Sequence, residues 1–482
     1  MRVERLLTQR AQLDPGKTAI VCEGSRYSYG WIQEEVERRA GTLLEGGLRA
    51  GERVAICLDT SVDAVVWLFA VLQAGGAFVL ISPRSPAPRV AAVVDDCDAA
   101  AIVSRSGNGR PDVTWRPHGA DVDPDLAALI YTSGSTGTPK GVMLTHGNIL
   151  FAARAVAAYL GNRPDDVVLS ALPISFTYGL SQITTMFLVG GTVVLEKSFA
   201  YPRQTLETMR REHVTGLPLV PTMATLLLQQ APSYSLPALR YMTNAAAALA
   251  PEKIQRLRAR FPGVPLYSMY GLTECQRASF LPPALLDTQP ASVGRALPGT
   301  DTAVVDDHDD ETPAGAVGEL VVRGPHVMKG YWKQPIATAS ALRRRGDGQT
   351  WLYTGDLFTR DEDGLLHFVE RRDSMIKTRG EKVAPRAVEQ VIARLQGVSE
   401  VAVFGVPDEL LGEAVVAVVT VAPGCSMTAA EIRRHCDEQL DGFMVPKVVD
   451  IRAELPTTTS GKISRLALRS LQVRRAEQGV AR

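Results

Sequence analysis

Two long apolar stretches, each interrupted by a pair of glycines, constrain the fold of this 482-residue chain most strongly. Residues 64–81 approach the length of a membrane span but contain Gln73 and the pair Gly75-Gly76, so they predict a buried helix, a turn and a buried strand. Residues 183–195 repeat this order, with Gly190-Gly191 ahead of a β-branched run. Helical and strand-like segments alternate through most of the chain. The pattern predicts an α/β fold, with layered sheets covered by helices and two similar halves.

The chain is too long for one hydrophobic core, which predicts at least two domains. A short strand at 365–369 is followed by the charged run 370–373. Beyond this run the pattern predicts a small α/β unit with its own elements: helices at 387–395 and 429–440, and strands at 401–406 and 414–421. We therefore predict a large N-terminal domain over 1–372 and a small C-terminal domain over 373–482.

Two polar stretches are predicted to be surface structure. Residues 104–125 are rich in Gly, Pro and charge, which favours a loop. The acidic run 306–311 lies between strand-like segments, so we interpret it as a solvated hairpin tip rather than a metal site.

Composition excludes several classes of protein. Lys and Arg total 52, as do Asp and Glu, so the chain lacks the basic excess that nucleic-acid binding requires. The six cysteines form no Cys-x-x-Cys pair, which favours a reduced protein without structural zinc. The first residues lack the apolar core of a signal peptide. We therefore expect a cytoplasmic protein with no membrane span and no nucleic-acid partner.

The run Tyr131-Thr-Ser-Gly-Ser-Thr-Gly-Thr-Pro-Lys-Gly141 has the composition of a phosphate-binding loop and follows the apolar segment 126–130. Glycines let backbone NH groups approach an anion, hydroxyls donate hydrogen bonds, and a lysine adds charge. The run is not a Walker A loop, because Pro139 precedes the lysine and Gly141 follows it. The predicted phosphate-binding residues are Thr132, Ser133, Gly134, Ser135, Thr136, Gly137, Thr138 and Lys140.

Residues 131–146 resemble the signature of the adenylate-forming superfamily of acyl-CoA synthetases, peptide-synthetase adenylation domains and luciferases. Further segments match that superfamily in the expected order along nearly the whole chain. The resemblance implies an enzyme that forms an acyl adenylate from ATP and a carboxylic acid, releasing pyrophosphate. Mg²⁺ is the implied cofactor, and the acyl group is then passed to a thiol of CoA or of carrier-protein phosphopantetheine.

Met269-Tyr-Gly-Leu-Thr-Glu274 resembles the segment that surrounds the adenine and α-phosphate. The resemblance implies that Tyr270 stacks on adenine, Thr273 meets the α-phosphate and Glu274 holds Mg²⁺, a hard cation that favours a carboxylate. Residues 243–248 take the place of the adenine-flanking segment, with Ala245 and Ala246 where the family is richer in glycine.

Three further positions follow from the resemblance. Asp356, in Tyr353-Thr-Gly-Asp356, matches the aspartate that accepts hydrogen bonds from both ribose hydroxyls. Arg371 matches an arginine that also contacts the ribose. Asp373 matches the hinge about which the small domain moves during the reaction.

Leu455-Pro-Thr-Thr-Thr-Ser-Gly-Lys462 resembles the loop that carries the catalytic lysine of the superfamily. A cation near the attacking carboxylate and the α-phosphate stabilises developing negative charge and aligns the two groups. Lys377-Thr-Arg-Gly380 resembles the segment lining the thiol passage, with Gly380 leaving room for the thiol arm.

The acid pocket of the superfamily follows the strand end at Leu172-Pro173. Enzymes for α-amino acids usually have an aspartate where we align Thr177, because a buried ammonium needs an opposite charge. Many CoA ligases have a histidine where Phe176 stands, so that signature is also missing. We expect an uncharged acyl chain or aromatic ring. The predicted substrate-binding residues are Phe176, Thr177, Ser181, Pro218, Asn244 and Gly271.

The acceptor and the catalytic competence remain open at the level of sequence. The pair Gly271-Leu272, where many peptide-synthetase domains have Gly-Pro, leans slightly toward the CoA ligases rather than enzymes that load a carrier-protein arm. The Phe-x-Tyr-Gly-Leu spacing at 176–180 also resembles enzymes acting on amino or imino acids. A second hypothesis replaces the thiol by an amine, and a third is an adenylate-binding protein without turnover. A separate acyl carrier protein is a possible partner, and the sequence is silent on oligomeric state.

Overall fold

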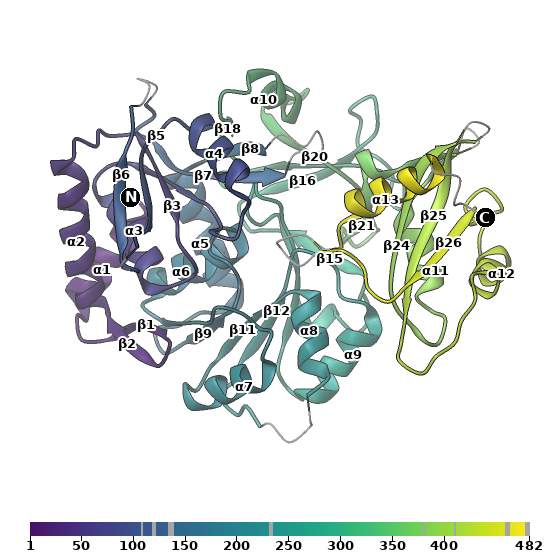
Figure 1. Ribbon diagram of the computed structural model, residues 1–482, viewed down its shortest axis with the longest axis horizontal. Coiled ribbons are helices and arrows are strands. Elements are labelled where there is room, and N and C mark those ends of the chain that lie inside the picture. Colours follow the sequence, from purple (N-terminus) through teal and green to yellow (C-terminus); the bar gives the residue numbers. More distant parts are fainter. Residues whose placement is uncertain are drawn as a thin grey trace. The chain divides into compact units, whose positions relative to one another are not determined.

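The computed structural model describes residues 1–107, 109–117, 122–133, 139–230, 235–378, 381–408, 411–457 and 463–477 (Figure 1). The chain forms two compact units. The large unit comprises Met1–Ala303, Val321–Thr354 and Asp363–Leu366, and the small unit comprises Val304–Leu320, Gly355–Glu362 and His367–Arg482. Each unit is described separately below. The predicted domain boundary at residue 372 stays a prediction.

The elements of the large unit, in chain order, are α1 (Arg5–Leu13), β1 (Thr18–Cys22), β2 (Ser25–Ser28), α2 (Tyr29–Glu45), β3 (Arg53–Cys57), α3 (Val62–Gln73), β4 (Ala77–Leu80), α4 (Ala87–Asp96), β5 (Ala99–Arg105), β6 (Pro111–Trp115), β7 (Leu126–Ser133), β8 (Pro139–Thr145), α5 (His146–Leu160), β9 (Val167–Ser170), α6 (Thr177–Val189), β10 (Thr192–Leu195), α7 (Pro202–Arg211), β11 (Gly216–Leu219), α8 (Pro221–Leu228), β12 (Tyr241–Asn244), α9 (Pro251–Arg260), β13 (Leu266–Tyr270), β14 (Ser279–Leu281), η1 (Pro283–Leu285), β15 (Ser292–Ala296), β18 (Gly330–Tyr331), α10 (Pro335–Ala341) and β19 (Leu342–Arg344).

The strands of the large unit form two sheets. One has parallel strands in the order β13-β12-β11-β9-β10-β1, with β2 antiparallel beside β1 and with β14 and β15 antiparallel beyond β13. The other has the order β18-β8-β7-β4-β3-β5-β6, in which β7, β4, β3 and β5 are parallel. The predicted α/β class with layered sheets is confirmed.

Both glycine-interrupted stretches fold as the sequence predicts. In the first, α3 ends at Gln73 and Gly75 adopts the left-handed φ of +84° before β4 begins. In the second, α6 ends at Gly190, with φ of +79°, before β10. Helix α3 is buried on all sides from Ala64 to Leu72, which explains its unbroken apolar sequence.

Helices α7, α8 and α9 cover one face of the first sheet, and Figure 1 shows them beside β9, β11 and β12. Their apolar residues pack with the strands in one continuous core: Leu206 and Met209 of α7, Met223 and Leu227 of α8, Ile254 and Leu257 of α9, and Leu217, Leu219 and Met242 of the strands. The strands' carboxyl ends are thereby held in fixed positions, and in parallel sheets ligands bind at those ends.

The prediction that residues 104–125 form only a loop is wrong in one part. Residues Pro111–Trp115 form β6, which pairs antiparallel with β5, including Val103 opposite Val113. The polar composition is that of an edge strand whose outer side faces solvent, and such a strand is easily mistaken for a loop. The strand predicted to end at Leu172-Pro173 also ends earlier, because β9 stops at Ser170.

Four strands are divided between the two units: β16 (Asp301–Val305), β17 (Gly318–Arg323), β20 (Thr350–Arg360) and β21 (Leu366–Arg371), which are neighbours in this order. The acidic run after β16 forms the expected hairpin tip. Asp306 accepts hydrogen bonds from the backbone NH groups of His308 (2.8 Å) and Asp310 (3.0 Å). Within the described ranges, no group of three or more His, Cys, Asp or Glu side chains is arranged to hold a metal ion.

The remaining elements of the small unit are η2 (Arg372–Ser374), β22 (Ile376–Thr378), β23 (Glu381–Val383), α11 (Pro385–Ile392), β24 (Val398–Asp408), β25 (Gly412–Val421), α12 (Ala429–Gln439), β26 (Val448–Arg452) and α13 (Arg465–Glu477). Alternate residues of β24 and β25 face opposite sides of their sheet. Val403 and Ala417 pack with α11 and α12, whereas Phe404 and Val416 pack with Leu468 of α13. None of the helices in the described ranges combines enough length and hydropathy for a membrane crossing.

Candidate active site

The predicted phosphate-binding run begins and ends on an antiparallel hairpin of the large unit. Strand β7 pairs with β8 so that Thr132 lies opposite Lys140 and Ser133 opposite Pro139. Thr132 and Lys140 are thereby placed on neighbouring strands at the mouth of the loop. The loop itself (Gly134, Ser135, Thr136, Gly137 and Thr138) and the side chain of Ser133 lie outside the described residues, so their phosphate contacts stay predictions.

A tyrosine that sequence reasoning missed connects this hairpin to the predicted metal ligand. Strand β18 pairs with β8, with Tyr331 opposite Val142. The Lys140 ammonium lies 5.3 Å from the centroid of the Tyr331 ring. The Tyr331 hydroxyl donates a hydrogen bond of 2.8 Å to Oε1 of Glu274. Lys140, Tyr331 and Glu274 therefore lie together although they are far apart in the sequence.

The turn that carries Glu274 is held on both sides. The carbonyl of Glu274 accepts a hydrogen bond of 2.7 Å from the NH of Met328. On the other side of the turn, Tyr270 at the end of β13 pairs with Ser279 of β14. Thr273 directly precedes Glu274 on this turn, as the prediction requires. Tyr331 lies in the sequence Gly-Tyr-Trp. In a chain with only 6% aromatic residues, these two adjacent aromatic residues are the sequence signal that could have identified it.

The arrangement of Glu274, Tyr331 and Lys140 suits the binding of Mg²⁺ together with phosphate. Mg²⁺ is usually held by one or two carboxylates, with phosphate oxygens and water completing its octahedral shell. Glu274 provides one carboxylate, oriented by Tyr331 and close to a lysine suited to phosphate. The donor set fits a cation that arrives with a nucleotide rather than a closed metal site.

The predicted adenine-flanking segment follows β12 in a strained turn. Ala245 is buried, and its NH donates to the carbonyl of Leu219 at 3.4 Å. Ala246 has φ of +72°, a left-handed conformation that costs a residue with a Cβ about 1 kcal/mol or more. Asn244 fastens the turn through a 2.9 Å hydrogen bond from Nδ2 to the carbonyl of Ala247. The structure explains why glycine suits this position.

Two of the predicted substrate-binding residues, Thr177 and Ser181, lie beside Tyr178 in the first turn of α6. The Tyr178 hydroxyl is 2.7 Å from Oγ1 of Thr243 and donates to its carbonyl at 3.1 Å. Thr243 in turn lies opposite Pro218 on β11. Thr177 and Ser181 flank Tyr178 on α6, and the Ser181 hydroxyl donates to the Tyr178 carbonyl at 2.9 Å.

Gly271 and Phe176 complete the predicted set. A Cβ at Gly271 would lie 2.4 Å from the carbonyl oxygen of Gln276, so only glycine fits this close approach. Phe176, just before α6, is 38% exposed and is the most exposed of the six. Two surface hollows, of about 640 Å³ beside α9 and about 400 Å³ beside α4, contain none of the predicted site residues.

In the small unit, the two predicted ribose-binding residues form an ion pair. Nε of Arg371 is 3.2 Å from Oδ1 of Asp356, whose carboxylate is buried. Gly355 has φ of +71°, and its NH donates to Oε1 of Glu319 at 2.9 Å. A Cβ on Gly355 would lie 3.5 Å from the Arg371 guanidinium. The backbone at Gly355 is thus fixed in a conformation that places Asp356 for its ion pair with Arg371.

Three other predicted residues of the small unit lie partly or wholly outside the described residues. Asp373 lies in η2, and its side chain lies outside the described residues. Gly380 and Lys462 lie wholly outside them. Thr457 and Ile463, on either side of the lysine loop, form an isolated antiparallel β-bridge.

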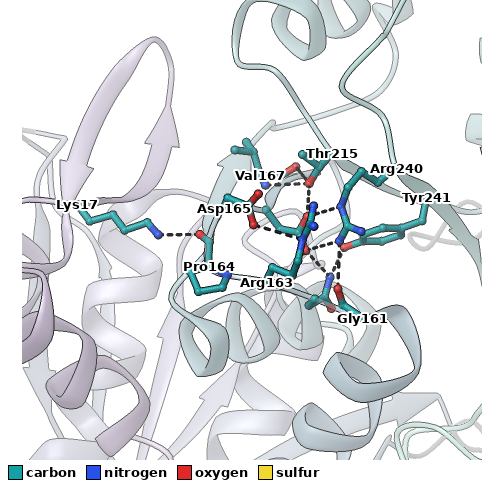
Figure 2. A network of polar contacts seen from close by, with 11 residues as sticks. Lys17, Gly161, Arg163, Pro164, Asp165, Val167, Thr215, Arg240 and Tyr241 are labelled. Atoms are coloured by element: carbon teal, nitrogen blue, oxygen red, sulfur yellow. Dashed lines mark hydrogen bonds and ion pairs between the residues drawn. The ribbon is translucent and has the colours of Figure 1, made fainter.

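A buried carboxylate holds the opposite ends of the site strands. Asp166, just before β9, is 1% exposed and accepts hydrogen bonds from Nε and Nη2 of Arg240 at 2.9 and 2.8 Å. It also accepts from the Thr215 hydroxyl at 2.8 Å. Figure 2 shows Thr215, Arg240 and Tyr241 of this network, which joins the amino ends of β9, β11 and β12.

The Asp166 network stabilises the charged carboxylate. Burial alone would raise the pKa of Asp166, but the hydrogen bond from Arg240 and those from Arg163, Asn162 and Thr215 outweigh burial and lower the pKa below its ordinary value. The carboxyl ends of the same strands carry Pro218 and Asn244. The network therefore fixes the strands on which part of the predicted site depends.

Comparison with known proteins agrees with these observations. Residues 7–332 match the model of the AMP-binding enzyme family, and residues 387–462 match that of the AMP-binding enzyme C-terminal domain. A feruloyl-CoA synthase from Amycolatopsis sp. is 34% identical, over 94% of this chain and 96% of its own.

Solved structures of similar proteins have the same fold. ATP-bound MatB from Rhodopseudomonas palustris is 31% identical with a TM-score of 0.87, covering 98% of this chain and 99% of its own. The amide bond synthetase McbA from Marinactinospora thermotolerans is 28% identical with a TM-score of 0.86, covering 98% and 100%.

Proposed function

From the premise that the chain belongs to the AMP-binding, adenylate-forming enzymes and is an AMP-forming acid–thiol ligase, we propose that it activates an aromatic or acyl carboxylic acid without an α-ammonium group and transfers the acyl group to CoA. The acid and ATP give the acyl adenylate and pyrophosphate. The thiol then displaces AMP.

One observation carries the assignment of roles: Glu274, Tyr331 and Lys140 lie together in the large unit. Lys140, with the loop residues beside it, binds phosphate oxygens. Glu274 would hold Mg²⁺, which when bound would supply positive charge to the phosphate oxygens of ATP. Tyr331 keeps the Glu274 carboxylate in place. Thr273, next to Glu274, contacts the α-phosphate.

The nucleoside contacts are assigned residue by residue. Tyr270 stacks on the adenine, with the backbone at Ala245 and Ala246 along its edge. Asp356 accepts hydrogen bonds from the ribose hydroxyls, and Arg371, whose Nε is 3.2 Å from Oδ1 of Asp356, forms an ion pair with this carboxylate. Lys462 places its ammonium against the reacting oxygens, and movement about Asp373 brings the small unit into position for the thiol step along Gly380.

The acid class is inferred from the side chains around Tyr178. Thr177 provides no carboxylate for an α-ammonium group, and a buried ammonium without a counter-charge is unfavourable by several kcal/mol. The similarity to a feruloyl-CoA synthase supports an aromatic acid and CoA as acceptor. The similarity to an amide bond synthetase keeps an amine acceptor as the second candidate.

The test is ATP–pyrophosphate exchange with aryl, acyl, hydroxy and amino acids, followed by AMP release with CoA, carrier-bound pantetheine or amines. We expect exchange with aryl or acyl acids and AMP release with CoA. Lys462→Ala should lower the exchange rate at least 100-fold, since it removes the cation at the reacting oxygens.

The matched control is Lys447→Ala. Lys447 is an exposed lysine of the same unit that pairs with Asp408 on the surface. We expect this variant to retain the wild-type rate. Exchange only with α-amino acids would refute the acid class, and product formation with amines but not CoA would establish the second candidate.

A further inference from the structure

Arg277 carries a buried positive charge that no carboxylate of the described residues neutralises. The residue is 4% exposed, and its Nε has no hydrogen-bond partner. Among the residues that the structure describes, no carboxylate forms an ion pair with it. Burying a guanidinium without a counter-charge is costly by several kcal/mol, so such a residue is retained where a ligand completes the pair.

Two other arginines of the large unit, the fully buried Arg53 and the partly exposed Arg240, have acceptors for their guanidinium groups. Arg53 is fully buried, but it donates to the carbonyl oxygens of Cys97 at 2.8 Å and Asp98 at 3.2 Å. Arg240 has the carboxylate of Asp166. Arg277 has neither arrangement.

The guanidinium of Arg277 lies among the predicted substrate-binding residues. It is 5.1 Å from the centroid of the ring of Tyr178, which lies between the predicted residues Thr177 and Ser181 on α6. It also hydrogen bonds with the hydroxyl of Tyr159. The Tyr159 ring stacks on Phe280 at 4.1 Å between centroids. The charge is therefore surrounded by aromatic rings.

A second unsatisfied polar atom belongs to a predicted substrate-binding residue. Oδ1 of Asn244 is buried without a hydrogen-bond partner, and Asn244 directly follows Thr243, which is bonded to Tyr178. Two buried polar atoms without hydrogen-bond partners, Nε of Arg277 and Oδ1 of Asn244, favour a polar ligand over a purely apolar one.

The direction of the side chain separates this charge from the phosphate-binding residues. Glu274 and Arg277 belong to the same turn, but Glu274 contacts Tyr331 of β18, whereas Arg277 contacts α5 and α6 through Tyr159 and Tyr178. Arg277 thus faces the predicted acid rather than the triphosphate.

We propose that Arg277 binds a second carboxylate on the acid substrate, so that the enzyme acts on dicarboxylic acids and adenylates the carboxyl group away from this arginine. This inference rests on the proposed function and replaces the uncharged chain expected from the sequence with an acid that is anionic at its far end. A guanidinium and a carboxylate match in charge and in geometry.

The test compares matched acids that differ only in the second carboxylate: phenylacetate with 4-carboxyphenylacetate, and hexanoate with adipate. The readout is the ratio of kcat/KM for the dicarboxylic acid to that for the monocarboxylic acid in pyrophosphate exchange. We expect the wild-type ratio to exceed tenfold for at least one pair. Arg277→Gln should lower this ratio at least 30-fold, since removing one partner of a buried charge pair costs about 2 kcal/mol or more.

Arg258→Gln is the control, because Arg258 is an arginine of the same unit that pairs with Asp287 on the surface. This variant should keep the wild-type ratio. A wild-type ratio below one, or an unchanged ratio in Arg277→Gln, overturns the proposal. An equal loss for both acids also overturns it, because Arg277 would then bind the carboxylate that both acids share.

Failure of the proposed function has a different signature, namely no exchange with any acid. In that case thermal stabilisation by 4-carboxyphenylacetate or adipate still tests the inference. The wild type should be stabilised and Arg277→Gln should not, and the absence of stabilisation in the wild type would refute the binding site. Arg277→Lys, which keeps the charge, should retain part of the effect and guards against misfolding of the Gln variant.

Discussion

Substituting Asp166 by Asn tests whether the buried network at the amino ends of β9, β11 and β12 organises the large unit. Asn has nearly the same shape as Asp but carries no charge. Its NH₂ group would replace a carboxylate oxygen that now accepts hydrogen bonds, and would therefore lie against a hydrogen-bond donor. The variant therefore loses the ion pair with Arg240 and at least one of the hydrogen bonds from Arg240, Thr215, Arg163 and Asn162.

The magnitude follows from burial. Removing one partner of a fully buried ion pair costs about 3–5 kcal/mol. The Arg240 side chain is 31% exposed and regains some hydration, so we expect the lower end, about 3 kcal/mol. At about 2 °C per kcal/mol for a unit of this size, the melting temperature should fall by about 6 °C.

The control is Asp165→Asn, next in sequence. Asp165 is 73% exposed and lies 3.4 Å from Arg163, so we expect a change below about 0.5 kcal/mol. The melting temperatures of the two variants are compared by thermal unfolding, with tryptophan fluorescence as the signal. Equal melting temperatures for Asp166→Asn and Asp165→Asn would refute the account of the network.

The pH dependence gives a second check on the same residue. The folded pKa of Asp166 is lowered from the ordinary value of 3.8, so its contribution to stability is present above about pH 4 and is lost as the pH falls through the folded pKa. The difference between wild type and Asp166→Asn should be full at pH 7 and shrink in acid. A difference that grows on acidification would contradict this reasoning.

Three further predictions concern single side chains. Tyr331→Phe removes the hydrogen bond to Glu274 but keeps the ring beneath Lys140, so kcat/KM for ATP should fall about tenfold; an unchanged value would exclude the positioning role. Asp356→Asn should raise the KM for ATP at least tenfold and abolish discrimination between ATP and 2′-deoxy-ATP, and continued discrimination would count against ribose binding. Burial lowers the pKa of His326 from 6.5 to about 4, so the unfolded chain binds more protons as the pH falls below about 6.5. His326 should therefore cost about 2 kcal/mol of stability at pH 5 relative to pH 7, and His326→Gln, measured by urea unfolding, should show a smaller loss.

Local sequence predicted the elements whose signals are local. The glycines at 75 and 190 end α3 and α6 through left-handed backbone, and the apolar runs beside them form the helices and strands expected. The elements after residue 385 also match, with α11, β24, β25 and α12 within a few residues of their predicted bounds. These segments could be predicted because periodicity and glycine act over a few residues.

Contacts between distant segments could not be predicted in this way. Tyr331 meets Glu274 because β18 pairs with β8, and that pairing has no signal in either segment alone. Strand β6 forms only because β5 offers it an edge. Arg277 reads in sequence as one more charged residue, and its burial beside Tyr178 depends on the packing of α6 against the end of β12.

The most direct test of adenylation uses an accepted acid labelled with oxygen-18 in its carboxyl group, incubated with ATP and CoA. If a carboxylate oxygen attacks the α-phosphate, one labelled oxygen remains on the AMP after the thiol displaces it, and mass spectrometry should find AMP carrying one oxygen-18. Unlabelled AMP, or label in inorganic phosphate, would contradict the acyl-adenylate route.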